Sequence, residues 1–469
     1  MRVRLEGTIE CRDLVVFVPG LMGSVLEKDG APLWDPGPRM GLRALLSRGA
    51  SLAALRLDGD SPTDDDIGDG IVATRLVDAI HMIPGLWKID AYGPVLKNLR
   101  ERLTLSPETN YYEHPYDWRR DIRHSARRLS REVTARLRAW RERSGDPSAQ
   151  VVVIAHSLGG LVARYYLECL GGWLDARSLI TLGTPHRGAV SALKSLVNGM
   201  TKGVGPLQLD FSEFVTSCTT SYQLLPIWEC YDGGDGSLAR PGEAEGIPGV
   251  DPARAAAGLA FHREIQEAVT SNRRDPHWAA QGYDLHPIVG TRQRTAISAR
   301  LEGGRLRTDD SIRGRQIDGD STVSRVSATP IELSGAGREV FVATKHSVLH
   351  NAPEVVHHVE GVITGASIDL AEFFADGEVD LSLELDDLYA AGAPIVAEVA
   401  ASDDPGALEV VITPAAGGSP VHRQVVAEGA LGEAIELPGL TAGSYRLRVS
   451  GGEGVRAIED VFEVLGEPA

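Results

Sequence analysis

The chain has 469 residues, 43% of them hydrophobic and 24% charged, the composition of a soluble globular protein long enough for more than one domain. Its net charge of -18 at pH 7 argues against nucleic-acid binding and against electrostatic adhesion to anionic lipid. No apolar run approaches the roughly twenty residues that span a bilayer, and the N-terminus lacks the apolar core of a signal peptide. The sequence therefore predicts a cytoplasmic protein without a transmembrane segment.

The four cysteines show no metal-ligand spacing, and the sequence predicts neither a metal nor a cofactor. We expect reduced, partly buried thiols at Cys11, Cys169, Cys218 and Cys230. A disulfide between Cys218 and Cys230 would be an alternative only in an exported protein.

The N-terminal part of the chain carries an apolar run at residues 14–18 that predicts a strand. It continues into a glycine-rich turn at residues 19–24, where backbone N–H groups can face outward. Residues 31–70 are loop-like and acidic toward their end. The acidic run 58–69 lacks the glycine and glutamate placement of a calcium loop, so it indicates a solvated surface excursion.

Two segments with helical periodicity follow, separated by a short strand. Residues 90–103 carry apolar side chains at helical spacing, and residues 110–113 predict the strand. From residue 121 to residue 143 an arginine-rich segment predicts a long helix with one buried stripe. The apolar residues of that stripe are Ile122, Ala126, Leu129, Val133, Leu137 and Trp140.

Ser157 lies where a buried strand meets a helix. Residues 151–154 are four consecutive β-favouring apolar residues, which predict a strand buried on both faces, and a helical pattern follows the serine. In a nucleophile elbow this sharp turn accepts only small residues two positions before and after the serine. Those residues are Ala155 and Gly159, and Ala155 departs from the usual glycine by one methyl group. Ser157 is therefore the candidate nucleophile.

A strand predicted at residues 179–182 ends in the turn 183–188, and strand, helix and strand in this order indicate a parallel α/β sheet. His186 in this turn precedes the place where such a fold positions its base, so we expect a structural or pocket-lining role. Residues 190–285 then interrupt the alternation with glycine, proline and scattered apolar residues. Such an insertion is typical of a lid or cap, and an apolar cap indicates an apolar substrate.

A serine nucleophile also needs an acid and a base, which follow it in the order serine, acid, histidine in the α/β-hydrolase fold. Strands are predicted at residues 287–290 and 339–343, and Ser157, Asp320 and His346 obey that order. Asp318 is an alternative acid.

The base has alternatives as well. His346 lies just beyond a predicted strand end, where a loop can reach back over the serine. His350, His357 and His358 fall within or after a helix predicted to begin at Pro353, although His350 could share the pocket of His346. His346 is therefore the candidate base.

An acyl-transfer reaction also needs two N–H donors aimed at the developing oxyanion. One normally belongs to the residue after the nucleophile, and the other to the loop after an early strand. Leu158 and Leu21 occupy these positions, so their backbone amides are the candidate oxyanion donors.

From about residue 365 the composition shifts to alanine, glycine, valine and glutamate with few aromatic residues. Residues 379–385, 408–413 and 444–449 alternate apolar and polar side chains, which predicts half-buried strands. We predict a separate β-sandwich over residues 365–469, immunoglobulin-like or transthyretin-like. Because exposed aromatic residues are scarce, a role in protein contact, oligomerisation or stabilisation is favoured over sugar binding.

Together these residues resemble the lecithin:cholesterol acyltransferase family of α/β-hydrolases, including its bacterial lipase-like members. The resemblance covers residues 14–355 and depends on the segments Val18-Pro-Gly-Leu-Met-Gly-Ser24, Tyr116-Asp-Trp-Arg119, Ala155-His-Ser-Leu-Gly-Gly160, Gly183-Thr-Pro-His-Arg-Gly188, Ser221-Tyr-Gln-Leu-Leu-Pro226 and Gly319-Asp-Ser-Thr-Val323, and on His346, Leu349 and Pro353. It implies a triad of Ser157, Asp320 and His346 and oxyanion donors at Leu21 and Leu158, the same residues that the pattern indicates.

The chain departs from the family in three ways. Ser321 stands where the family usually has glycine and Ser324 where it usually has proline, which predicts a differently shaped acid loop. The secretory signal and disulfide pattern of animal members are missing, which argues against extracellular lipoprotein substrates.

In the 116–119 segment we expect Asp117 and Arg119 to hold a loop rather than to take part in chemistry.

We therefore predict an α/β-hydrolase domain over residues 1–364, with a cap at about 190–285. Its predicted activity is that of a serine esterase or lipase acting on hydrophobic esters, phospholipids first among them, through an acyl-enzyme. The cap could touch a membrane surface transiently. The alternatives are an O-acyltransferase with an alcohol acceptor and, from a different class, a catalytically silent hydrolase fold used as a binding scaffold.

Overall fold

The computed structural model describes residues 11–35, 54–77, 81–83, 87–89, 92–202, 209–335, 337–365, 379–386, 388–401, 404–415, 418–427, 434–452 and 455–465. The chain divides into two compact units, Met1–Ser367 and Ile368–Ala469. Each unit is described by itself.

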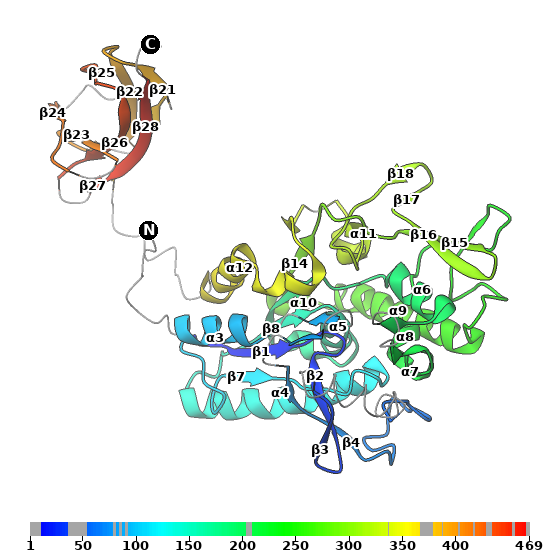
Figure 1. Ribbon diagram of the computed structural model, residues 1–469. Coiled ribbons are helices and arrows are strands. Elements are labelled where there is room, and N and C mark those ends of the chain that lie inside the picture. The colour runs from blue at the N-terminus through cyan, green and yellow to red at the C-terminus, as the bar shows by residue number, and fades with distance from the viewer. Residues whose placement is uncertain are drawn as a thin grey trace. The chain divides into compact units, whose positions relative to one another are not determined.

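The first unit is built on a six-stranded sheet in which every neighbouring pair of strands is parallel (Figure 1). Its strand order is β19 (Val340–Val342), β14 (Asp284–Gly290), β9 (Ala176–Leu182), β8 (Val151–His156), β1 (Leu14–Val18) and β7 (Tyr111–Glu113). The predicted α/β class with a parallel sheet is confirmed. Strands β8 and β1 are buried along their whole length, in agreement with their unbroken apolar runs.

Helices cover both faces of this sheet. Alternate residues of β8 enter two different buried clusters, with Val151 and Val153 on one face and Val152 and Ile154 on the other. The first face packs against α4 (Ile122–Ser144), α5 (Leu158–Cys169) and α9 (Pro252–Asn272). The second packs against α3 (Gly93–Arg102) and α12 (Pro353–Thr364).

The long helix α4 begins and ends where its sequence supplies caps. The Asp121 carboxylate accepts a hydrogen bond from the Arg123 N–H at 2.8 Å. Gly145 follows the last turn with a φ of 73°, a conformation that glycine adopts without strain. The predicted helix over residues 121–143 is therefore confirmed to within one residue at each end.

Arginine side chains beside this cap hold the acidic segment of residues 54–77. The fully buried Arg119 donates from Nη2 to Asp69 Oδ2 at 2.7 Å and from Nη1 to the Leu55 carbonyl at 3.3 Å. Its Nε donates to Asp117 Oδ1 at 2.9 Å. The loop-holding role predicted for Asp117 and Arg119 is confirmed.

Residues 31–34 differ from the sequence prediction of a loop. They form β3 (Ala31–Trp34), which pairs with β2 (Ser24–Lys28), and β2 also pairs with β4 (Ile71–Leu76). Trp34 is buried, and its Nε1–H donates to the Met22 carbonyl at 3.0 Å. This contact ties the small sheet to the turn that follows β1. Residues 36–53 of the predicted loop lie outside the described residues.

The segment between β9 and β14 is not a cap throughout. It contains α6 (Val190–Asn198), α7 (Ser212–Ser217), α8 (Thr219–Gln223), α9 and α10 (Trp278–Gln281). Helix α9 packs on α5, where the rings of Phe261 and Tyr165 stack with centroids 5.7 Å apart. It is the crossover helix that two neighbouring parallel strands require, and the sequence prediction placed it in the insertion.

The structure outside the main sheet also extends past residue 285. Strand β12 (Tyr231–Asp232) pairs with β15 (Ser298–Glu302), which follows β14 in the chain. Strands β13 (Leu238–Ala239) and β16 (Arg305–Asp309) complete this small sheet. Residues that precede β14 in the chain and residues that follow it therefore form this small sheet together.

The second unit consists of β-strands in its described residues. One sheet has the order β25 (Ala434–Leu437), β22 (Ile395–Ala401), β20 (Val379–Leu385) and β27 (Val455–Arg456). The other has the order β21 (Leu388–Ala390), β28 (Ile458–Leu465), β26 (Gly443–Ser450), β23 (Leu408–Pro414) and β24 (His422–Val426). One buried cluster joins residues of both sheets. The predicted additional β-structure is confirmed, while its immunoglobulin-like or transthyretin-like topology and its role in protein contact stay predictions.

None of the helices in the described ranges combines the length and the apolar content that crossing a bilayer requires.

Candidate active site

The turn between β8 and α5 holds Ser157 in a strained backbone conformation. Its φ is 51° and its ψ is -123°, values that residues with a Cβ rarely adopt. The Ser157 N–H donates to the Leu182 carbonyl at 2.9 Å, and the Gly160 N–H donates to the Ser157 carbonyl at 3.0 Å. The turn is therefore fixed on both sides of the serine.

Close packing explains why small residues surround the serine. A Cβ placed on Gly159 would lie 2.4 Å from the Pro19 carbonyl oxygen. One placed on Gly160 would lie 1.9 Å from Thr184 Oγ1. Ala155, two positions before the serine, is fully buried within the strand β8 and is accommodated there.

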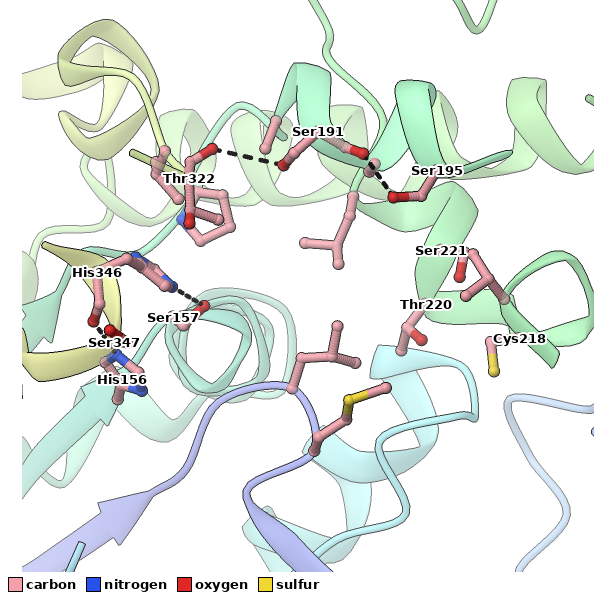
Figure 2. A pocket seen from close by; sticks show the side chains of 18 of the residues that line it. His156, Ser157, Ser191, Ser195, Cys218, Thr220, Ser221, Thr322, His346 and Ser347 are labelled. Carbon is pink, nitrogen blue, oxygen red and sulfur yellow. Dashed lines mark hydrogen bonds between the residues drawn. The ribbon is translucent and has the colours of Figure 1, made fainter. Parts of the chain in front are cut away.

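The structure brings Ser157, His346 and Asp320 together. His346 Nε2 lies 2.8 Å from Ser157 Oγ, and His346 Nδ1 lies 2.6 Å from Asp320 Oδ2. His346 begins the short helix η4 (His346–Asn351), four residues after β19 ends. Figure 2 shows its ring directed at Ser157. The arrangement provides a path for a proton from the serine hydroxyl to the imidazole.

The acid is held by its own loop. Asp320 is 1% exposed, and its Oδ1 accepts hydrogen bonds from the N–H groups of Thr322 at 3.0 Å and Val323 at 2.7 Å. Its carbonyl accepts from the His346 N–H at 2.8 Å. Both carboxylate oxygens are therefore engaged, and the backbone of the acid positions the backbone of the histidine.

Ser321 and Ser324 shape the acid loop through their backbone conformations. Ser321 has a φ of 81°, a conformation that favours glycine, and its N–H donates to Thr295 Oγ1 at 2.9 Å. Ser324 has a φ of -70°, which proline would also adopt. The backbone thus takes the conformations of glycine and proline with serine at both places.

The alternative acid and two of the alternative bases lie elsewhere. Asp318 Oδ2 accepts a hydrogen bond from the Arg292 N–H at 2.7 Å. His357 is exposed on α12, and the ring of His358 contacts that of His286 with centroids 6.1 Å apart. His186 Nε2 lies 3.3 Å from Thr181 Oγ1, and burial lowers its pKa well below the ordinary value.

His350 differs from its sequence prediction. It lies in η4, before the helix α12 begins, and not within or after that helix. It is 1% exposed, and its ring lies 4.8 Å from that of Tyr92 and 4.7 Å from that of His156, measured between centroids. His350 nevertheless lies close to His346, because both rings contact the ring of His156, with centroids 5.2 Å away for His346 and 4.7 Å away for His350.

His156 and Tyr92 form a polar layer beneath the serine. Tyr92 Oη lies 2.8 Å from His156 Nδ1 and accepts a hydrogen bond from the Gly20 N–H at 2.8 Å. Burial raises the pKa of Tyr92, and burial, with the neighbouring His350 and His346, lowers the pKa of His156. Both side chains are therefore neutral near pH 7.

A cavity of about 410 Å³ opens beside Ser157 and His346. Figure 2 shows Ser191 and Ser195 on one wall and Cys218, Thr220 and Ser221 on another. Its apolar lining residues include Leu21, Met22, Ala189, Met200, Phe214, Val215 and Leu224. None of the described residues that line it is Asp, Glu, Lys or Arg. Helices α6, α7 and α8 supply lining residues, whereas α9 supplies none.

The two candidate oxyanion donors lie beside the serine. Leu21 lines the cavity and is 40% exposed, and Leu158 is buried as the first residue of α5. Tyr92, Ser191 and Ser195 line the same cavity and were not singled out in the sequence. Tyr92 and Ser191 are hydrogen-bonded to residues far away in the sequence, whereas Ser195 donates to the Ser191 carbonyl one helical turn earlier. No local pattern marks any of the three as a pocket residue. Within the described residues, no group of three His, Cys, Asp or Glu side chains is arranged to hold a metal ion.

Comparison with known proteins supports the resemblance drawn from the motifs. Residues 85–241 match the family model "Lecithin:cholesterol acyltransferase". A phospholipid–sterol O-acyltransferase of Arabidopsis thaliana is 30% identical over 149 residues, which cover 26% of this chain and 22% of the plant protein. An uncharacterised protein of Saccharomyces cerevisiae is 33% identical over 97 residues, which cover 20% of this chain and 14% of the yeast protein. The matched stretches thus span less than a quarter of either relative.

One solved structure has a similar fold. A chain of the Tle4–Tli4 complex superposes with a TM-score of 0.51 at 14% identity, covering 77% of this chain and 99% of that one. At this identity the likeness concerns the fold alone.

Proposed function

Because residues 85–241 match the lecithin:cholesterol acyltransferase family, we propose that this chain is a serine esterase or lipase related to it. It hydrolyses carboxylic esters with hydrophobic acyl groups, phospholipids first among them. The observation that carries this proposal is the hydrogen-bonded series from Asp320 through His346 to Ser157, with distances of 2.6 and 2.8 Å, at a strained strand-to-helix turn.

The reaction proceeds through a covalent acyl-enzyme. His346 Nε2 takes the proton of Ser157 Oγ as the oxygen attacks the ester carbonyl, and Asp320 stabilises the imidazolium that forms. The N–H groups of Leu21 and Leu158 donate to the oxyanion of the tetrahedral intermediate. Collapse breaks the ester bond, and the leaving alcohol takes its proton from His346. Water then attacks the acyl-enzyme by the same steps in reverse and releases the carboxylic acid.

The chemistry of the cavity supports a hydrophobic, uncharged acyl group. Its described lining contains aliphatic, aromatic, hydroxyl and imidazole side chains and no carboxylate, ammonium or guanidinium group. An acyl chain bound there needs no counter-ion, whereas an anionic or cationic acyl group would be desolvated without a partner. The charged part of a phospholipid would accordingly stay outside this cavity.

Acyl transfer to an alcohol is the second candidate function. It is supported by the matched stretch of the plant phospholipid–sterol O-acyltransferase. Every residue of the proposed mechanism serves both reactions. They differ only in whether water or an acceptor alcohol attacks the acyl-enzyme.

Product analysis tests the proposal. The purified chain would be incubated with p-nitrophenyl esters of increasing acyl length and with phospholipid vesicles, each with and without an added alcohol such as a sterol. We expect free fatty acid from the longer esters and from phospholipid, and none with Ser157→Ala. Acylated alcohol at the expense of fatty acid would indicate the transferase. Turnover restricted to short, water-soluble esters would contradict the lipid assignment and leave the mechanism in place.

A catalytically silent scaffold is the alternative from a different class. A fluorophosphonate probe distinguishes it, because the probe forms a covalent adduct only with an activated serine. An unlabelled wild-type chain would favour the scaffold.

A further inference from the structure

The peptide bond between Pro19 and Gly20 is held at both of its polar atoms by buried tyrosine hydroxyls. Tyr116 Oη–H donates to the Pro19 carbonyl at 2.8 Å, and the Gly20 N–H donates to Tyr92 Oη at 2.8 Å. Tyr116 is 1% exposed and Tyr92 3%. Because the C=O and N–H of a planar trans peptide point in opposite directions, the two tyrosines hold this plane from two sides.

The next peptide bond, between Gly20 and Leu21, is held through its carbonyl. The Gly23 N–H donates to the Gly20 carbonyl at 3.0 Å. The Leu21 N–H belongs to the same plane and therefore points away from Gly23. Two consecutive peptide planes thus have fixed orientations, and the second carries the candidate oxyanion donor.

These planes pack directly against the nucleophile. A Cβ placed on Gly20 would lie 3.0 Å from the Ser157 Cβ and 3.0 Å from His156 Nδ1. A rotation of the Pro19–Gly20 plane would therefore displace the loop relative to the serine. Leu21 and Ser157 line the same cavity, so the relative placement of their backbones decides where an oxyanion can bind.

We infer that Tyr92 and Tyr116 are positioning residues that clamp the Pro19–Gly20 peptide and thereby preset the Leu21 N–H for the oxyanion. The Tyr92 hydroxyl is hydrogen-bonded to Gly20 and His156, and the Tyr116 hydroxyl to Pro19. Both tyrosines therefore act on the serine and on His346 through the loop. The inference rests on the proposed function and adds to it the origin of one oxyanion donor's orientation.

The clamp also connects the oxyanion loop to the base. Tyr92 Oη accepts from Gly20, so its own proton is directed to His156 Nδ1 at 2.8 Å. The opposite ring nitrogen, His156 Nε2, lies 3.4 Å from the His346 carbonyl oxygen and donates to it. His156 is neutral because burial lowers its pKa, so Nδ1 stays an acceptor. One series of hydrogen bonds therefore links the backbone of Gly20 to that of His346.

Removing either hydroxyl leaves buried backbone groups without their partner. Tyr92→Phe leaves the Gly20 N–H and His156 Nδ1 unpaired, and Tyr116→Phe leaves the Pro19 carbonyl unpaired. Loss of a whole oxyanion donor typically lowers kcat by about a hundred- to a thousand-fold. Because the donor is misdirected here and not removed, we expect kcat per active site to fall by about ten- to a hundred-fold. We expect KM to change by less than about two-fold, since the phenyl ring still fills its place.

The experiment compares Tyr92→Phe, Tyr116→Phe and the matched control Tyr111→Phe with the wild type. Tyr111 is also buried and donates to Glu113 Oε1 at 3.1 Å, but it lies on the edge strand β7 and does not line the cavity. Active sites are counted with a fluorophosphonate before kcat and KM are measured on a p-nitrophenyl ester, which removes the effect of any unfolded fraction.

A second readout separates positioning from general loss of structure. An alkyl trifluoromethyl ketone forms a tetrahedral adduct whose oxyanion needs the Leu21 N–H, so its affinity should fall by the same factor as kcat/KM. The pH profile of kcat/KM should keep its midpoint, because His346 and Asp320 are untouched. The Tyr111→Phe control should match the wild type in each of these measurements.

The outcomes distinguish the clamp from the proposed function. Wild-type activity per titrated site in both Tyr92→Phe and Tyr116→Phe would overturn the clamp while leaving the esterase in place. An equal loss in Tyr111→Phe, or a ketone affinity that does not follow kcat/KM, would also overturn it. A wild-type chain that neither hydrolyses esters nor takes the fluorophosphonate would overturn the proposed function and the clamp together. Tyr92→Phe and Tyr116→Phe act on the two polar groups of one peptide bond. If one of these variants does not fold, the other variant alone tests the clamp.

Discussion

The two ends of helix α5 differ in how their polar groups are used. At its N-terminal end, Ser157 holds a strained φ of 51° and faces a cavity. In its C-terminal half, Arg164 and Glu168 lie in a closed, buried network with no strained backbone among their residues. One end holds a strained backbone at the proposed nucleophile, whereas the charged side chains at the other end pair with each other. Substitutions at the first end should therefore change turnover, and those at the second should change stability.

The network at the second end is nearly closed to solvent. The side chain of Arg164 is 4% exposed and that of Glu168 0%. Arg164 Nη1 lies 3.2 Å from Glu168 Oε1 and donates to Tyr283 Oη at 2.8 Å, and Arg164 Nη2 donates to Glu332. Tyr283 Oη–H in turn donates to Glu168 Oε1 at 2.6 Å. The network joins α5 to the segment before β14 and to the residues after Asp320.

The largest effect is expected at Ser157. Ser157→Ala should lower kcat on the order of a million-fold, because no other described group replaces the nucleophile. Ser157→Gly should be equally inactive but should raise the free energy of unfolding by about 1 kcal/mol, because glycine adopts this φ without strain. Ester turnover and chemical denaturation of the two variants measure this. Equal stability of the alanine and glycine variants would show that the turn stores no strain.

The next effect is expected at Arg164. Arg164→Met leaves the buried Glu168 carboxylate without its cation and leaves Glu332 with only Arg273, whose Nη2 lies 3.9 Å from Glu332 Oε1. This change should lower the free energy of unfolding by about 3–5 kcal/mol. The turnover of each titrated site should stay unchanged. The control is Arg300→Met, which removes an ion pair to Asp232 whose arginine side chain is 54% exposed. That change should be within about 0.5 kcal/mol, and a similar loss in both variants would contradict the comparison.

A smaller effect on turnover is expected at Leu21. Leu21→Pro removes the backbone N–H and should lower kcat by about a hundred- to a thousand-fold. Leu21→Ala keeps that N–H and should lower it much less. The two variants control for each other in a single steady-state assay. Losses of the same size would mean that the side chain, and not the amide, matters at this position.

The smallest effect concerns the pH dependence of stability and His262 in α9. Burial lowers the pKa of His262, whose Nε2–H donates to the Gln223 carbonyl at 2.7 Å, to about 4. In the unfolded chain His262 takes up a proton as the pH falls through about 6.5, whereas in the folded chain it stays neutral until about pH 4. Its contribution to the free energy of unfolding is therefore fully present above pH 6.5 and is lost as the pH falls toward 4. The loss reaches about 3 kcal/mol at most.

His262→Gln should flatten this dependence. Denaturant titrations between pH 4 and 7 measure it, and the turnover per titrated site at pH 7 should match that of the wild type. An unchanged slope in the variant would mean that other buried histidines, such as His114, account for the dependence.

Parts of the fold and the site could be predicted because their signals are local. The buried strands at residues 14–18 and 151–154 are unbroken apolar runs, and the serine turn needs small neighbours within two residues. The order of Ser157, Asp320 and His346 follows from chain position alone, and the structure places the three within hydrogen-bond distance. Their catalytic roles stay proposals.

Other parts could not be predicted because they depend on contacts between distant residues. Tyr92 lies 72 residues from Gly20 and 64 from His156, and no periodicity marks it. Helix α9 was hidden by alanine residues and by Gly258, which packs against the Tyr222 carbonyl and interrupts the apolar spacing. His350 was misplaced because a six-residue helix has too few residues to show a period.

The most direct test of the central claim is the mass of the intact chain after reaction with a fluorophosphonate, followed by peptide mapping. We predict one adduct, on Ser157, that disappears in Ser157→Ala and forms far more slowly in His346→Asn. An adduct on another serine, or labelling of Ser157 at the same rate without His346, would contradict the claim that these side chains act as one nucleophilic unit.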